Sequence, residues 1–212
     1  MTQHINVPDK FLVYGDCYYT KRGKFDDLDT SLRALTAQGC FQDLDRVAFM
    51  LIKPDAVVSG KAVKLLQRLL QHGFVFAHAE IHSQKRERDF EELYKFNLTK
   101  HNAANMLCAW WLARRVYTMG PSVDLLLSHR DPDCRGQSLY KLIGDMKGVS
   151  NPYACDQASL RGSLRACNRS LNLVHASDSP MASVREFGIF RSVDALIQGI
   201  RRATGSPHSE SI

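Results

Sequence analysis

The sequence predicts an α+β fold of the split βαβ kind, in which an antiparallel sheet carries helices on one face. Apolar runs of strand length alternate along the chain with stretches whose apolar residues recur at helical spacing. This alternation lacks the strict one-to-one rhythm of a doubly wound parallel sheet. Apolar residues make up 44% of the 212 residues, which is enough for a sizeable core and argues against global disorder.

Residues 1–45 form a predicted N-terminal extension ahead of the main domain. A short apolar run at 11–14 has the length of a strand. The polar residues further on offer caps for a helix that carries Leu32 and Leu35 and stops at Gly39. The extension contains no catalytic pattern, so we expect it to pack on the main domain or on a neighbouring subunit.

The main domain, residues 46–202, opens with two predicted strand–helix pairs. Residues 47–52 are a continuous apolar run suited to the centre of a sheet, and the helix after them ends at Gly73. A second strand is predicted at 74–81 and a second helix at 87–97. The apolar face of the first helix is predicted to consist of Val63, Leu66, Leu69 and Leu70. The corresponding face of the second helix consists of Phe90, Leu93 and Tyr94.

The second half of the main domain is less regular. We expect residues 98–119 to be helical for much of their length and residues 123–127 to form a third strand. A short helix at 139–143 precedes a polar loop at 144–159, and loops of more than about 12 residues in a compact domain are usually functional or disordered. The tail at 203–212 is expected to be disordered.

The net charge of +6, with 28 Lys and Arg residues, favours an anionic partner: phosphorylated metabolites, nucleic acid and acidic surfaces all fit this sign. The six cysteines are scattered, without a CxxC pair or a metal-like cluster. We therefore expect reduced thiols, a cytoplasmic protein and no protein-bound metal site. No run approaches the roughly 20 apolar residues that span a bilayer, so we expect no membrane association.

The stretch around His175 carries the clearest chemical signal. An apolar run leads into the histidine, and a turn of small residues follows it. Ser179 and Pro180 then provide the N-cap and the first position of a helix, which we expect Gly188 to end. Glu186 near the end of this helix is in a position to return to the imidazole. A carboxylate there would fix the tautomer and leave the other ring nitrogen as a nucleophile.

Lys53 provides a second signal. Pro54 follows it directly and disfavours the helical conformation for the preceding residue. We therefore expect the ammonium group to project from the end of the first strand of the main domain.

Four motifs together resemble the nucleoside diphosphate kinase family over about residues 46 to 190. They are FMLIKPD at 49–55, QHGF at 71–74, LRG at 160–162 and NLVHASDS at 172–179 with Glu186. The resemblance implies a ferredoxin-like fold and a ping-pong phosphotransferase (transferase, kinase). In such a reaction a histidine takes the γ-phosphoryl of a nucleoside triphosphate such as ATP and passes it to a nucleoside diphosphate. Mg²⁺ would bridge the phosphates, and the family forms homo-oligomers.

The resemblance implies a role for each matched residue. His175 would be the nucleophile and Glu186 would hold its tautomer, while Lys53 and Arg161 would neutralise charge on the transferring phosphoryl group. A neutral imidazole is required for attack, so activity should fall in acid. The remaining matches are Tyr94, which would orient the cluster, Asn172, which would contact the sugar hydroxyls near the phosphates, and Ser177 and Asp178, which would brace the histidine turn.

Plainer interpretations exist for each residue taken singly. Lys53 would fit a solvated strand end, Arg161 a surface basic cluster, Glu186 a helix charge and Tyr94 a core position. We favour the functional interpretation because false motif matches rarely recur together and in order.

The departures from the family pattern are specific. Ala176 replaces a glycine after the histidine. The phosphate-contacting arginine and threonine align either with Tyr140 and Met146 or with Gly144 and Ser150. Candidate substitutes for the arginine are Lys141, Arg135 and Lys147, although a lysine lacks the bidentate fork. The aromatic platform for the base fails to align as well, since Asn102 follows Tyr94 at that spacing and Trp110 and Trp111 come later. An altered choice of nucleotide is our hypothesis.

Two other functional classes stay open. One is a catalytically weak nucleotide-binding module that acts through a partner, which the altered phosphate contacts favour and the retained His175 and Glu186 disfavour. The other is nucleic-acid binding, which we regard as the weaker alternative. It rests on the net charge and on Arg161, Arg165, Arg169, Arg201 and Arg202.

Overall fold

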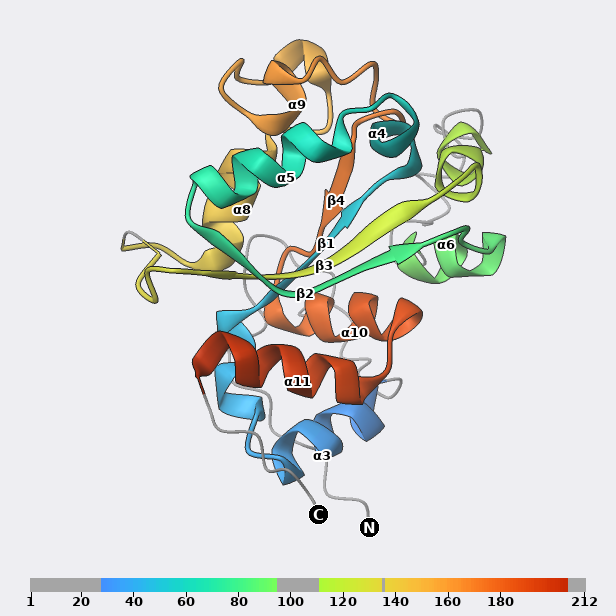
Figure 1. Ribbon diagram of the computed structural model, residues 1–212. Helices are drawn as coiled ribbons and strands as arrows, with labels where there is room; N and C mark the ends of the chain where they lie inside the picture. The colour runs from blue at the N-terminus through green and yellow to red at the C-terminus, as the bar shows by residue number, and fades with distance from the viewer. Residues whose placement is uncertain (1–27, 95–110, 135, 206–212) are drawn as a thin grey trace.

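The computed structural model describes residues 28–94, 111–134 and 136–205. In these parts of the chain a four-stranded sheet has the strand order β2-β3-β1-β4 (Figure 1). Its strands are β1 (Ala48–Ile52), β2 (Phe74–His82), β3 (Ser122–His129) and β4 (Val174–Ala176). The three pairings between neighbouring strands are all antiparallel. The predicted strands at 47–52, 74–81 and 123–127 are confirmed, and the one predicted at 11–14 lies outside the described residues.

Helices cover both faces of the sheet, so the prediction of helices on one face is wrong (Figure 1). The reason lies in β1, whose residues are all buried. Ala48, Met50 and Ile52 face one core, and Phe49 and Leu51 face the other. A strand that is apolar at every position requires cover on both sides.

The two helical layers come from different parts of the chain. The face with Met50 is covered by α4 (Pro54–Val58), α5 (Ala62–Gln71), α8 (Leu139–Lys147) and α9 (Leu160–Ser163). The face with Leu51 is covered by α6 (Glu87–Tyr94), α10 (Pro180–Phe190) and α11 (Val193–Thr204).

Helix α5 buries only part of the predicted face: Leu69 is buried and Leu66 packs against the core as predicted, but Val63 and Leu70 do not. Leu65 and Leu69 are fully buried against the sheet, whereas 63% of Val63 and 42% of Leu70 are exposed. Both stripes have helical spacing, and the packing on β1 and β2 selects one of them. Gly73 follows the helix with a φ of +89°, which fits its predicted role at the C-terminus.

Two predicted helix ends are wrong. Helix α10 continues through Gly188 to Phe190, because Phe190 packs on Phe49 with ring centroids 5.8 Å apart. Helix α8 runs to Lys147 instead of residue 143. The loop predicted at 144–159 therefore begins at Gly148, and it contains the short 3-10 helix η3 (Pro152–Ala154).

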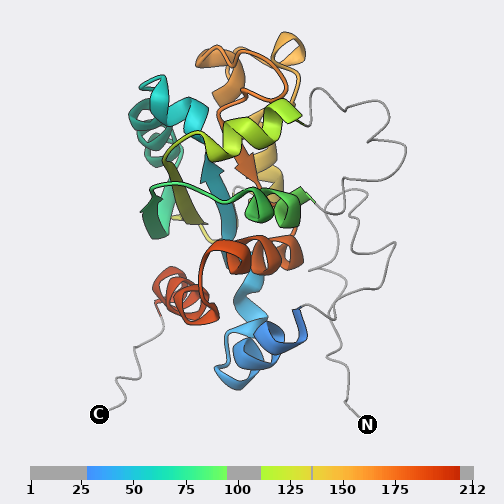
Figure 2. The same ribbon diagram turned by 90° about the vertical axis from the view of Figure 1, so that its right-hand side faces the viewer.

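The predicted helix in the extension is present as α3 (Asp29–Ala37), and the 3-10 helix η2 (Phe41–Arg46) follows it. Leu32 and Leu35 share a core cluster with Leu196 and Ile200 of α11. The described part of the extension thus packs on the main domain of the same chain, beyond α10 and α11 (Figure 2).

Three further stretches bear on the predictions. Residues 111–118 are helical, within the stretch expected to be so. Helix α11 reaches Thr204, inside the tail expected to be disordered, and 206–212 lie outside the described residues. Within the described residues, no helix combines the length and the apolarity needed to cross a membrane.

A buried charge cluster lies on the face of the sheet that α10 covers. Asp124 of β3 is fully buried, and its carboxylate accepts hydrogen bonds from Lys85 Nζ at 2.8 and 3.1 Å. Arg191 Nη2 lies 3.0 Å from Asp124 Oδ2. Burial lowers the pKa of Lys85, and the charge of Asp124 opposes that shift. Asp124 therefore compensates two cations that are largely withdrawn from water.

We expect Asp124→Asn to lower the free energy of unfolding by about 3–5 kcal/mol, because the substitution removes the carboxylate that pairs with the buried Lys85, while Arg191 keeps its ion pair with Glu80 at 2.6 Å. Urea unfolding followed by circular dichroism measures the change. The matched control is Asp145→Asn, which removes an exposed carboxylate paired with Lys141 and should change stability by less than about 1 kcal/mol. Equal effects of the two substitutions would contradict the assignment.

Candidate active site

His175 lies in the middle of β4, one of the two edge strands of the sheet, opposite Leu51 of β1. The pairing continues past the strand, since the Ser177 N–H donates to Phe49 O at 3.0 Å. Directly opposed residues share one face of a sheet, so the imidazole stands on the face that α10 covers. Its backbone is therefore fixed by the strand before and the turn after it.

Helix α10 brings Glu186 back to the imidazole. Ser179 Oγ accepts a hydrogen bond from the Ala182 N–H at 3.1 Å, and Pro180 takes the first helical position. Glu186 Oε2 lies 2.8 Å from His175 Nε2. The Ser177 hydroxyl donates to the same carboxylate oxygen at 2.6 Å, so Ser177 holds Glu186 and not the histidine itself.

Glu186 is ionised although it is buried. Burial alone would raise the pKa of this carboxyl, but the charge and hydrogen bond of His175, together with Arg185 and Ser177, hold the pKa below its ordinary value. Arg185 Nη2 lies 3.6 Å from Glu186 Oε1. An ionised carboxylate can only accept, so Nε2 carries the ring proton and Nδ1 keeps its lone pair in the neutral imidazole.

Tyr94 faces this second nitrogen. Its hydroxyl lies 3.3 Å from His175 Nδ1 and 2.5 Å from the hydroxyl of Tyr117. Burial raises the pKa of Tyr94, so the hydroxyl keeps its proton and is able to donate. Sequence reasoning missed Tyr117, which lies two residues after Arg115 and belongs to no motif.

Lys53 occupies a buried position beside Tyr117, with only 2% of the residue exposed. The backbone of Lys53 is extended, as predicted. Its ammonium donates to Ser170 O and, at 2.8 Å, to Asn172 Oδ1, and it lies 4.9 Å from the centre of the Tyr117 ring. Burial lowers the pKa of Lys53 to about 8; the charge of Asp55 raises it and that of Arg161 lowers it.

Arg161 is also buried and is bound to the protein backbone. Its guanidinium donates to Asn172 O at 3.1 Å, to Gly148 O at 2.7 Å and to Val174 O at 2.8 Å. These bonds use three of the five donors that an arginine carries. The Asn172 amide in turn donates to Arg169 O at 2.8 Å. Lys53, Arg161 and Asn172 thus form one group that ties the loop before β4 to the sheet.

Asp55, the last residue of the FMLIKPD motif, has a structural role that the sequence did not reveal. Leu173 has a φ of +73°, a backbone conformation that L-residues rarely adopt. Asp55 Oδ2 accepts from the Leu173 N–H at 2.9 Å, and Leu173 O accepts from the Lys53 N–H at 2.9 Å. These two bonds fix the turn that leads into His175.

The structure therefore brings most of the predicted residues into two adjoining groups. Glu186, Ser177 and Tyr94 surround His175. Lys53, Arg161 and Asn172 form the second group, and Tyr117 joins the two through the Tyr94 hydroxyl and the Lys53 ammonium. Asp178 is the exception, because 72% of its side chain is exposed and its described ion pair is with Lys147 at 3.6 Å.

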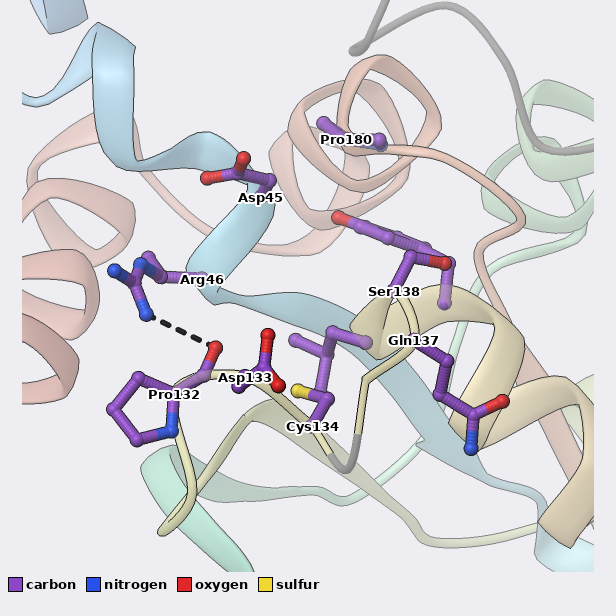
Figure 3. A pocket seen from close by; sticks show the side chains of 10 residues that line it. Asp45, Arg46, Pro132, Asp133, Cys134, Gln137, Ser138 and Pro180 are labelled. Carbon is purple, nitrogen blue, oxygen red and sulfur yellow. Dashed lines mark hydrogen bonds between the residues drawn. The ribbon is translucent and has the colours of Figure 1, made fainter.

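A cavity of about 310 Å³ lies elsewhere, between η2, the loop before α8 and Pro180 (Figure 3). None of the predicted site residues lines it. Arg46 Nη1 donates to Pro132 O at 3.1 Å along one wall, and the Tyr140 hydroxyl already donates to Val47 O at 2.6 Å. The predicted site residues lie around His175 and not around this cavity.

Comparison with known proteins gives one consistent result. A sequence profile described as nucleoside diphosphate kinase matches residues 46–195. A nucleoside diphosphate kinase of Methanocorpusculum labreanum is 27% identical over 142 residues, which are 66% of this chain and 84% of that protein. One from Fervidobacterium nodosum is 29% identical over 149 residues, 70% of this chain and 90% of that one.

The fold agrees with a solved structure as well. A crystal structure of the Aquifex aeolicus nucleoside diphosphate kinase superposes with a TM-score of 0.56 at 21% identity, covering 69% of this chain and 95% of that one. Together with the antiparallel four-stranded sheet, this shows the predicted α+β, ferredoxin-like architecture.

The site geometry predicts one tautomer of His175, with the proton on Nε2. We expect ¹⁵N-resolved NMR at about pH 9, above the ordinary histidine range, to show a protonated Nε2 and a bare Nδ1. Glu186→Ala should yield a mixture of both tautomers, because the acceptor that fixes the proton is gone. Glu91→Ala removes an exposed carboxylate of α6 and should leave the spectrum of His175 unchanged. A protonated Nδ1 in the unmodified protein would refute the assignment.

Proposed function

We propose that this chain, which belongs to the nucleoside diphosphate kinase family, transfers the γ-phosphoryl group of a nucleoside triphosphate to a nucleoside diphosphate through a phosphohistidine on His175. The observation that supports this most directly is the orientation of the imidazole. Nε2 is held by Glu186 at 2.8 Å, and Nδ1 is directed to a hydroxyl 3.3 Å away. One ring nitrogen is thereby fixed and the other is available for attack.

The two steps mirror each other. In the first, the Nδ1 lone pair attacks the γ-phosphorus, the bond from phosphorus to the bridging oxygen breaks, and the diphosphate leaves with the electron pair. In the second, a terminal phosphate oxygen of the acceptor attacks the phosphorus, and the P–N electrons return to Nδ1. Glu186 stabilises the Nε2–H through both steps, since positive charge develops on the ring while the P–N bond exists.

The neighbouring cations supply the charge neutralisation that phosphoryl transfer needs. Lys53 and Arg161 keep donors beyond their bonds to the protein, and Tyr94 keeps its proton for a phosphate oxygen once Nδ1 is phosphorylated. Within the described residues no cluster of three or more His, Cys, Asp or Glu side chains could hold a metal ion. This fits Mg²⁺ that enters bound to the nucleotide phosphates, since Mg²⁺ in such sites is bound largely through them.

Three wider features belong to the same proposal. The acceptor is a nucleoside diphosphate or a related phosphorylated compound, with an altered base preference. The protein acts as a homo-oligomer, which the exposed Val75 and Ile81 on the edge strand β2 support. It acts in the cytoplasm, and the free thiols of the four described cysteines fit that reducing compartment.

Incubation with γ-labelled ATP should leave an acid-labile label on the unmodified protein and none on His175→Ala, because the attacking nitrogen is removed. His72→Ala removes an exposed imidazole and should leave the labelling unchanged. Chasing the labelled protein with different diphosphates then reveals the acceptor. Nucleotide binding without any label would favour the binding module instead, and a label that survives His175→Ala would place the chemistry at another residue.

The low pKa of Lys53 predicts an alkaline limb in the rate profile. The ammonium is present below about pH 8 and is lost as the pH rises through that value. We therefore expect kcat/KM, which reports on the free enzyme, to fall above about pH 8, and kcat to fall at a higher pH because bound phosphate stabilises the ammonium. Lys53→Arg, which stays charged, should abolish this limb at a reduced rate. A flat wild-type profile to about pH 9.5 would show that Lys53 does not neutralise the substrate.

A further inference from the structure

Lys147, the last residue of α8, reaches the histidine turn from the opposite side of the sheet. Its ammonium lies 3.5 Å from Ala176 O and 3.6 Å from Asp178 Oδ1, on the two sides of Ser177. Only 16% of its side chain is exposed. Burial lowers its pKa, and among the groups that act on it are Asp178, Arg161 and Glu186, which places Lys147 in the electrostatic environment of the site.

Lys147 and Arg161 cap the same strand edge. Among the strands of the described residues, β4 pairs with β1 alone, and the carbonyl groups of Val174 and Ala176 point away from β1. Arg161 Nη2 donates to Val174 O at 2.8 Å, and Lys147 Nζ lies 3.5 Å from Ala176 O. Two cations therefore flank the backbone of His175, one residue before it and one residue after it.

The two cations differ in how firmly the protein holds them. Arg161 makes three hydrogen bonds of 2.7 to 3.1 Å. Lys147 has three donors, but its two partners lie at 3.5 and 3.6 Å, beyond the usual range for charge-assisted bonds. Asp178, one of those partners, is largely exposed, so water weakens this ion pair. An ammonium held this weakly is able to exchange its partner for a stronger anion.

Within the described residues, Lys147 is also the best placed of the three candidates for the missing arginine. Lys141 is exposed and pairs with Asp145 at 2.5 Å on the outer side of α8. Arg135 lies outside the described residues. Both alignments of the missing arginine, at Tyr140 and at Gly144, fall on α8, the helix that Lys147 ends.

We propose that Lys147 binds the phosphate groups of the nucleotide beside His175, exchanging its contact with Asp178 for the more highly charged phosphate oxygens. This proposal rests on the proposed function for the identity of the ligand, but it concerns binding and needs no transfer step. A terminal phosphate group carries up to two negative charges, which makes it a stronger partner for the ammonium than a carboxylate in a site partly withdrawn from water.

The test is the binding of ADP, pyrophosphate and adenosine to the full chain by titration calorimetry. Lys147→Gln removes the charge and keeps a hydrogen-bonding end near Ala176 O. It should weaken ADP and pyrophosphate by about 10-fold or more and leave adenosine unchanged, because the lost contact is to phosphate alone. Lys147→Arg should retain most of the affinity. The matched control Lys141→Met removes the same charge from the same helix at an exposed position and should change binding by less than about twofold.

The outcomes separate the two proposals. If the unmodified protein binds ADP and Lys147→Gln binds it equally well, Lys147 has no part in phosphate binding, whatever the labelling experiment shows. An equal loss of adenosine would point to a structural effect and also overturn the proposal. If ADP binds in a Lys147-dependent way but no label reaches His175, the phosphate contact stands and the transfer reaction fails. No ADP binding at all overturns both. Lys147→Met repeats the test if the glutamine variant fails to fold.

Discussion

The burial of β1 on both faces determines where His175 can lie. Its alternate side chains belong to two cores, so helices must pack on both faces. On the Leu51 face this packing is made by Phe187, whose ring meets Phe49 edge-on with centroids 6.0 Å apart. Glu186 precedes Phe187 in α10, and His175 is directly opposite Leu51. The packing that buries the Leu51 face of β1 therefore also places the Glu186 carboxylate beside the His175 imidazole.

The turn before β4 adds a second constraint, which is local and unfavourable by itself. The left-handed backbone conformation of Leu173 costs on the order of 1–3 kcal/mol of folding free energy. Gly148 has a φ of +80°, and a Cβ there would lie 2.5 Å from Ser159 Oγ. The backbone conformations at Leu173 and Gly148 orient carbonyl groups that accept hydrogen bonds from Arg161. These bonds, and the one from the Leu173 N–H to Asp55, offset the conformational cost of the turn. Arg161, to which the proposed mechanism assigns charge neutralisation, therefore also stabilises the loop before β4.

The sequence predicted what depends on local pattern and missed what depends on long-range packing. The strands of the main domain, the Ser179–Pro180 helix start and the extended Lys53 follow from apolar runs, capping residues and proline sterics. The prediction for α5 was wrong at Val63 and Leu70, because the sheet selects one of two possible helix faces. The predicted end of α10 was wrong because Phe190 extends the helix past Gly188. Tyr117 and Asp55 were missed because their partners are distant in the chain.

In the proposed function, a phosphate competes with the hydrogen bonds that the cations already make within the protein. Lys53 and Arg161 donate to the amide oxygen or the backbone carbonyls of residues 148 to 174, so a phosphate must add to these bonds or replace some of them. Replacement would release the loop before β4, and addition would keep it closed. The low pKa of Lys53 favours addition, since its buried charge is under-compensated by neutral oxygens and gains most from an anion. Lys147 is paired with an exposed carboxylate, that of Asp178, and this pair is weaker than the bonds of Lys53 and Arg161. In the proposed function, the contact that a phosphate replaces most easily is therefore the one between Lys147 and Asp178.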